Sequence, residues 1–109
     1  VQQNRPSKQM IVYAASKAAQ LNMVKNLAWQ LGNKGITINN LAPGVIGTVR
    51  NEEVLSNEVF KTKIEKNIPL GYIGEPDDLA SMALLLCSEA GRYLSGADIL
   101  VDGGMSLPE

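Results

Sequence analysis

Apolar residues recur at helical spacing between Tyr13 and Leu31, and this periodicity predicts a helix over that range. The residues that set the period are Leu21, Val24, Leu27, Ala28 and Leu31. Gly32 follows directly, and glycine is a typical residue at the end of a helix. We therefore expect ordered structure from near Ile11 and a helix that stops at Gly32.

Two short runs have the pattern of strands. Ile36–Ala42 is rich in β-branched residues and lies between Gly35 and Pro43, which favours a strand that the proline ends. Ala97–Asp102 follows a turn at Gly91–Gly96 and predicts a second strand.

The segment between these runs is polar at first and then strongly apolar. Residues 51–67 are charged and carry a broken apolar stripe, which predicts one or two surface helices. Pro76 suits a first helical turn, and Leu79–Ser88 is apolar on more than one side, which predicts a core helix packed against a sheet. Helix, strand, further helices and strand in this order indicate parallel strands joined by crossovers, the α/β class.

Composition narrows the class of protein. The chain has 109 residues, of which 45% are apolar, and a formal charge of −1 from 10 basic and 11 acidic residues, as in one soluble globular domain. Because there is no dense basic run, we expect neither a nucleic-acid nor an anionic-membrane partner. No apolar stretch reaches the roughly 20 residues that cross a bilayer, so we expect no transmembrane segment.

Histidine and cysteine content restricts the chemistry. Histidine is absent, which excludes Ser-His-Asp and Cys-His catalysis and most zinc sites, so we expect no bound metal. Cys87 is the single cysteine, which rules out an internal disulfide and suits a cytoplasmic location. We expect Cys87 to pack in the core, together with Met23, Trp29 and Met82. Proton transfer must then use tyrosine, lysine or a carboxylate.

Tyr13 and Lys17 lie four residues apart, a spacing that places both side chains on one face of the predicted helix. An ammonium close to a phenol favours the phenolate, so the pair could exchange a proton near neutrality as a general acid/base. Chance alone would give roughly 0.2 such spacings in this sequence, so the pair needs support from its surroundings.

Two further motifs supply that support. Asn40–Thr48, with the sequence Asn-Leu-Ala-Pro-Gly-Val-Ile-Gly-Thr, follows the first strand, while Leu94–Ala97 and Val101–Gly104 frame the second. The three signals together resemble the short-chain dehydrogenase/reductase family, in its simple single-domain branch, over essentially all of the chain. The resemblance implies the C-terminal part of a Rossmann-like doubly wound parallel sheet, with about two strands and their flanking helices.

The resemblance also implies a function, an NAD(P)-dependent oxidoreductase that interconverts a secondary alcohol and a ketone by hydride transfer. Tyr13 would be the general acid/base, and Lys17 would assist it and bind the nicotinamide ribose. The cofactor-binding residues would be Tyr13, Lys17, Pro43, Gly44, Val45, Ile46 and Thr48, with backbone groups of Ile46 at the carboxamide. The cofactor would be NAD or NADP, and the substrate a small alcohol or ketone, with sugars among the candidates.

Other parts of the chain acquire expected roles from the same resemblance. Residues 49–70 would form a substrate lid, and the last strand would pack at the subunit interface of a homo-oligomer. Tyr72 stands where relatives commonly carry arginine, a departure expected to weaken a local ion pair and not catalysis.

Several features of the family have no counterpart in this sequence. They are the glycine-rich turn for the pyrophosphate, the selector for the adenosine ribose, the asparagine of the proton relay and the catalytic serine. We therefore expect residues 1–109 to be the C-terminal fragment of one dehydrogenase domain, inactive by itself and self-associating through an uncovered strand edge. Two alternatives stay open, a non-catalytic scaffold or interaction protein that retains the family's dimer surface, and an extended relative such as a sugar-nucleotide epimerase.

Overall fold

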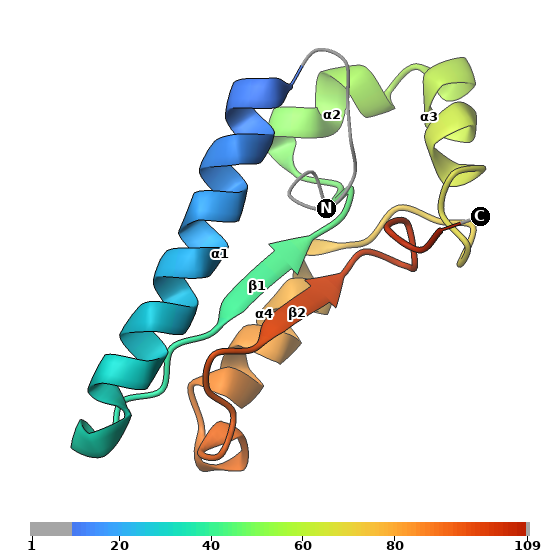
Figure 1. The fold of residues 1–109 in the computed structure, drawn as a ribbon. Helices are drawn as coiled ribbons and strands as arrows, with labels where there is room; N and C mark the ends of the chain where they lie inside the picture. The colour runs from blue at the N-terminus through green and yellow to red at the C-terminus, as the bar shows by residue number, and fades with distance from the viewer. Residues whose placement is uncertain (1–9, 109) are drawn as a thin grey trace.

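The computed structural model describes residues 10–108 (Figure 1). Two strands, β1 (Asn40–Pro43) and β2 (Asp98–Val101), form a parallel sheet in register from Asn40 opposite Asp98 to Pro43 opposite Val101. The helical elements between them form the crossover that a parallel pair requires. The expected α/β class, with two parallel strands and flanking helices, is confirmed.

The first helix, α1 (Ile11–Leu31), runs beside β1 in the opposite direction (Figure 1). Its least exposed positions follow helical spacing and form one stripe, made of Ala14, Lys17, Leu21, Val24, Ala28 and Leu31. The predicted helix is therefore confirmed, and four of the five predicted apolar positions lie on this stripe. Leu27 does not, because it is 37% exposed.

The helix stops where predicted, since α1 ends at Leu31 and Gly32 is its C-cap. Gly32 keeps right-handed helical geometry and opens a short 3₁₀ turn, η1 (Gly32–Lys34). Gly35 has a φ of 72° and ends the turn, with its N–H donating to the Gly32 carbonyl. The left-handed conformation is adopted by Gly35 at the end of η1 and not by Gly32 at the end of α1.

The first strand is shorter than predicted, because β1 begins at Asn40 and residues 36–39 have no regular secondary structure. The Asn39 side chain accepts a hydrogen bond from the Ala97 N–H and donates one to the Leu94 carbonyl, which ties this approach to the turn before β2. Pro43 closes β1 from within the strand instead of following it. The ladder continues past it, since the Gly44 N–H donates to the Val101 carbonyl.

Two short helices, α2 (Val49–Leu55) and α3 (Glu58–Glu65), follow β1 and lie beyond the carboxyl ends of the strands (Figure 1). They match the predicted surface helices. The Asn57 side chain caps α3 by accepting from the N–H groups of Val59 and Phe60.

The helix before β2 is α4 (Pro76–Leu86), with Pro76 in its first turn as predicted and a reciprocal capping box between Glu75 and Asp78. A short turn, η2 (Glu89–Gly91), connects it toward β2. The prediction of a core helix is wrong, because no residue of α4 is buried and Leu84 is 72% exposed. Two strands offer too little surface to cover more than one side of it.

The chain as a whole is open. Its accessible surface is 8187 Å², against about 5,900 Å² for a compact monomer of this mass, and its radius of gyration is 15.7 Å, against about 13 Å. Among residues 10–108 the buried apolar side chains are those of Ala28, Ala42, Ile46 and Ile68.

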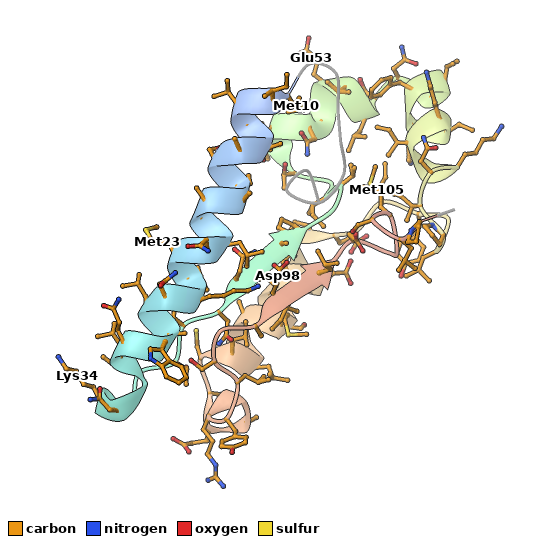
Figure 2. All side chains as sticks on the ribbon, viewed as in Figure 1. Met10, Met23, Lys34, Glu53, Asp98 and Met105 are labelled. Carbon is orange, nitrogen blue, oxygen red and sulfur yellow. The ribbon has the colours of Figure 1, made fainter. Side chains whose placement is uncertain are left out.

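Three residues expected to pack in the core are instead exposed. Trp29 is 90% exposed and Met23 57%, and Cys87 is exposed as well. Met23 projects away from the sheet in Figure 2. The expectation was wrong because these residues lie on helix faces that neither strand reaches; Met82, which is half-buried on the stripe of α4, is the one that partly packs.

Candidate active site

The first turns of α1 hold Tyr13 and Lys17, at the end of the molecule toward which the strands run (Figure 1). The Lys17 ammonium nitrogen lies 5.4 Å from the centroid of the Tyr13 ring, within the range of a cation–π contact. Tyr13 is 46% exposed, and the Ser16 hydroxyl donates to its backbone carbonyl at 2.7 Å. The structure therefore places the two side chains next to each other, with the phenol accessible.

A loop at residues 44–48 leaves the carboxyl end of β1, and its first residue has no room for a side chain. A Cβ built on Gly44 would lie 2.7 Å from both Cα and Cβ of Asp102. Glycine is needed here because the loop passes directly over the end of β2.

The same loop is fixed to the segment before α4. The Gly74 N–H donates to the Val45 carbonyl at 3.1 Å, and the Gly74 carbonyl accepts from the Gly47 N–H at 2.9 Å. These two hydrogen bonds hold the peptide groups on either side of Ile46, whose side chain is buried at 7% exposure.

The two backbone groups of Ile46 differ in what they contact. Its carbonyl accepts from the Thr48 N–H at 2.9 Å and from the Asn51 side-chain amide at 2.8 Å. Within residues 10–108, no group accepts a hydrogen bond from its N–H. An unpaired N–H on a buried residue costs about 1–3 kcal/mol unless a ligand or water accepts from it, so this donor marks a candidate ligand position.

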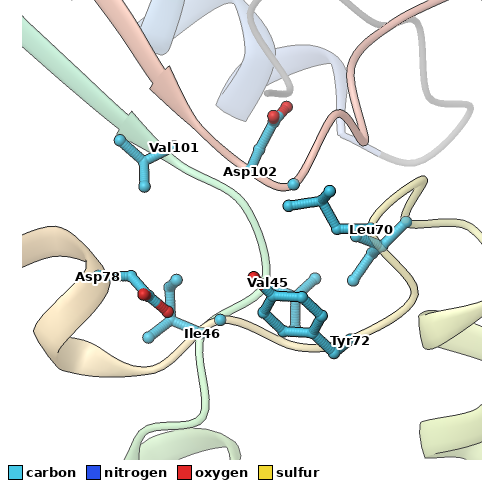
Figure 3. A pocket seen from close by; sticks show the side chains of 10 residues that line it. Val45, Ile46, Leu70, Tyr72, Asp78, Val101 and Asp102 are labelled. Carbon is cyan, nitrogen blue, oxygen red and sulfur yellow. The ribbon is translucent and has the colours of Figure 1, made fainter.

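A cavity of about 210 Å³ lies under the loop (Figure 3). Its walls come from the loop, from residues 68–74, from Asp78 in α4 and from the end of β2. The lining is mainly apolar, and the ring of Tyr72 lies across it in Figure 3. The Asp78 carboxylate accepts from the Glu75 N–H at 2.7 Å, so it serves the helix cap.

Asp102 is the residue of this region whose acidity is perturbed. Burial by itself would raise the pKa of its carboxyl group, but hydrogen bonds from the Ser106 hydroxyl and from the N–H groups of Gly104 and Ser106 lower the pKa below its ordinary value. The carboxylate therefore organises the turn that follows β2.

The structure groups the candidate residues only in part. Val45 and Ile46 line the cavity, whereas Tyr13 and Lys17 do not, and Pro43 is exposed at the end of β1. Thr48 lies on the open side toward α2, and its side chain does not cap that helix. The pair on α1 and the loop are thus two separate parts at the same end of the fold.

Sequence reasoning missed Gly74 and Asn51, which hold the loop from outside it. Neither residue belongs to a recognisable motif, and both act through contacts that no spacing predicts. From the sequence, Asp102 was identified only as the end of the second strand and as part of the Val101–Gly104 motif; its hydrogen bonds to the following turn are visible only in the structure.

Two kinds of site are absent from the part of the chain that the structure describes. Residues 10–108 contain no group of acidic or cysteine side chains placed to hold a metal ion. Within the same residues, no helix is long and apolar enough to cross a membrane.

Comparison with known proteins identifies the family of the chain. A family model described as enoyl-(acyl carrier protein) reductase matches residues 1–106. The chain is 40% identical over 95 residues to 3beta-hydroxysteroid dehydrogenase 1 of Eggerthella lenta, and 42% identical over 93 residues to L-rhamnose 1-dehydrogenase (NAD(P)(+)) of Azotobacter vinelandii. These matches cover 87% and 85% of the chain but 36% of each relative.

A solved structure is similar over the whole chain. It is that of YwfH, an NADPH-dependent reductase involved in bacilysin biosynthesis, with a TM-score of 0.92 at 30% identity. The match covers 100% of this chain and 45% of that one. The chain therefore spans between a third and a half of the length of the proteins it resembles.

Proposed function

Because this chain belongs to the short-chain dehydrogenase/reductase family, matching the C-terminal part of its members, we propose that it supplies one half of an NAD(P)-dependent alcohol dehydrogenase site. In this proposal the site interconverts a secondary alcohol and a ketone. The observation that carries it is the contact between Tyr13 and Lys17 at the carboxyl end of the parallel strands, where open α/β sheets bind ligands.

Tyr13 exchanges the proton of the substrate oxygen. Conversion of an alcohol to a ketone removes a proton from that oxygen, and a phenol that is 46% exposed can reach a substrate that approaches from solvent. The Lys17 ammonium, beside the ring, stabilises negative charge on the phenol oxygen as the proton moves.

The loop after β1 has the donor groups that a nicotinamide needs. The free N–H of Ile46 matches the carboxamide oxygen, and Gly47 lacks a side chain that would block approach. Pro43, Gly44, Val45 and Thr48 complete the proposed cofactor contacts on this side. When bound, the nicotinamide ring supplies or accepts the hydride.

The names of the relatives give a general class of substrate and cofactor, and they do not distinguish NAD from NADP for this chain. Their names give a sugar and a hydroxysteroid as substrates, and NAD(P) or NADPH as cofactor. We therefore propose a small secondary alcohol, with a sugar as one candidate. Residues 49–70, which contain α2 and α3, are the proposed substrate lid.

The proposal is tested in a chimera that restores the relatives' length. The amino-terminal part of the Azotobacter L-rhamnose dehydrogenase is joined to this chain, and sugars and hydroxysteroids are assayed with NAD⁺ and NADP⁺. We expect turnover by the chimera and none by the 109-residue chain, which lacks the assignable pyrophosphate turn and serine.

Tyr13→Phe should lower kcat of the chimera about 10²- to 10⁴-fold, the usual contribution of a positioned acid/base. Tyr93→Phe is the matched control, because Tyr93 is 99% exposed and lies in the segment between η2 and the start of β2, not at the carboxyl ends of the strands. A folded, cofactor-binding chimera that keeps full activity without the Tyr13 hydroxyl would refute the assignment.

A non-catalytic role is the second candidate, favoured by the large exposed apolar surface. In that case the chain would act as a scaffold through exposed apolar residues of α1 such as Trp29 and Met23. A chimera that folds, binds no dinucleotide and still assembles with other subunits would support the scaffold role over the enzyme.

A further inference from the structure

Asn51 connects the loop after β1 to α2. It is the third residue of α2, half-buried, and its side-chain amide donates to the Ile46 carbonyl oxygen at 2.8 Å. The partner is a carbonyl, which only accepts, so the amide nitrogen must face the loop and the orientation of the side chain is fixed.

This contact occupies the remaining acceptor site of the Ile46 carbonyl. A carbonyl oxygen has two lone pairs, and the Thr48 N–H already uses one of them. Since Asn51 uses the other, the carbonyl has no capacity left for a ligand, while the N–H of the same residue stays available. Ile46 therefore offers a donor and no acceptor.

We propose that Asn51 is a positioning residue. Its amide occupies the last acceptor site of the Ile46 carbonyl, which leaves the Ile46 N–H as the group that orients the cofactor carboxamide. This inference rests on the proposed function. A carboxamide has an oxygen that accepts and an NH₂ group that donates. Because the Ile46 carbonyl has no acceptor site left, the loop binds the carboxamide through the carboxamide oxygen. The NH₂ group of the carboxamide then adds little binding energy at Ile46.

The inference predicts an unusual tolerance for cofactor analogues. The 3-acetylpyridine analogue of NAD(P)⁺ keeps the acceptor oxygen and replaces NH₂ with a methyl group. The active chimera should therefore have similar KM values for the two cofactors. In Asn51→Ala the carbonyl becomes free to accept from NH₂, so the KM ratio of analogue to natural cofactor should rise about 2- to 12-fold, the effect of one neutral hydrogen bond.

Asn67→Ala is the matched control, because the Asn67 amide also donates to a backbone carbonyl, that of Lys63, at 2.9 Å. It should leave the ratio unchanged. Asn51→Asp keeps the side-chain shape without the donor and should raise the ratio as Asn51→Ala does. The inference would be overturned if the KM ratio of analogue to natural cofactor stayed unchanged in both Asn51 variants. If activity were lost in Tyr13→Phe in the same experiment, the proposed function would still hold.

A second measurement uses the 109-residue chain and no cofactor. Loss of a donor moves the ¹³C resonance of a carbonyl upfield, so the Ile46 carbonyl signal should move in Asn51→Ala and stay in place in Asn67→Ala, which should move the Lys63 signal instead. An Ile46 carbonyl signal that does not move in Asn51→Ala overturns the inference, whether or not the chimera is active. A chimera without turnover counts against the proposed function alone.

Discussion

At the scale of single residues, Gly44 and Asp102 decide how closely the loop after β1 can approach β2. The loop crosses the strand end with no space for a methyl group, and the Asp102 carboxylate holds the next turn in place. Both residues act on the backbone around the candidate site and not on a reacting atom.

Gly44→Ala should destabilise the chain by about 1–3 kcal/mol, because a Cβ 2.7 Å from the Asp102 backbone must push the loop away. Gly32→Ala is the matched control. Gly32 has right-handed φ and ψ and nothing within 4 Å of the new methyl group, so this change should be neutral or stabilise by up to about 1 kcal/mol. Urea unfolding of the two variants measures the difference, and equal midpoints would contradict the close approach.

The lowered pKa of Asp102 predicts a pH dependence of stability. The folded pKa lies below the unfolded value, so the stabilisation is present above the unfolded pKa near 3.8 and is lost as pH falls through the folded pKa. Asp102→Asn should be less stable than the parent chain by about 1–3 kcal/mol at neutral pH, since hydrogen bonds to a charged group are lost. Denaturation from pH 7 to 2 should show this gap closing in acid, and a constant gap would contradict the role of the ionised form.

At the scale of elements, α3 depends on a single polar cap. It has eight residues, none of them buried, so packing contributes little and the Asn57 cap contributes much. Asn57→Ala should cost α3 about 1 kcal/mol, seen as faster hydrogen exchange at the Val59 and Phe60 amides. Asn57→Asp keeps the acceptor and should retain protection; equal exchange in both variants would rule out the cap.

Elements governed by local patterns were predictable from the sequence. Helix α1 has apolar spacing, α4 has proline in its first turn, and the contact between Tyr13 and Lys17 follows from helical geometry. The ends of β1 and the exposure of Leu84 were not predictable, because they depend on which segments lie opposite in space.

The same division holds within the candidate site. The motif around Pro43–Thr48 identified the loop from the sequence, whereas the hydrogen bonds that hold it come from Gly74 and Asn51. Gly74 lies 28 positions after Ile46 along the chain, and a tertiary contact of that kind leaves no periodic signal. The sequence therefore located the proposed cofactor-binding residues, but it could not show that the Ile46 carbonyl already accepts hydrogen bonds from Thr48 and Asn51.

At the scale of the whole molecule, the open surface predicts self-association. Parallel strands are normally covered on both faces and flanked by further strands, and large exposed apolar residues remain on α1. Light scattering should give a mass that rises with concentration, and Trp29→Ser should shift that rise to several-fold higher concentration. Gln30→Ser, at the adjacent exposed position, is the control and should have no effect. A stable monomer at all concentrations would contradict the prediction.

The small number of buried apolar side chains also has a thermal consequence. The heat-capacity change of unfolding scales with the apolar surface that becomes exposed, about 12–15 cal/mol/K per residue in compact domains. A chain whose apolar core in residues 10–108 consists of four side chains exposes less, so its heat-capacity change is smaller. The free energy of unfolding then curves only gently with temperature, and the chain melts over a broad interval until a partner covers its surface.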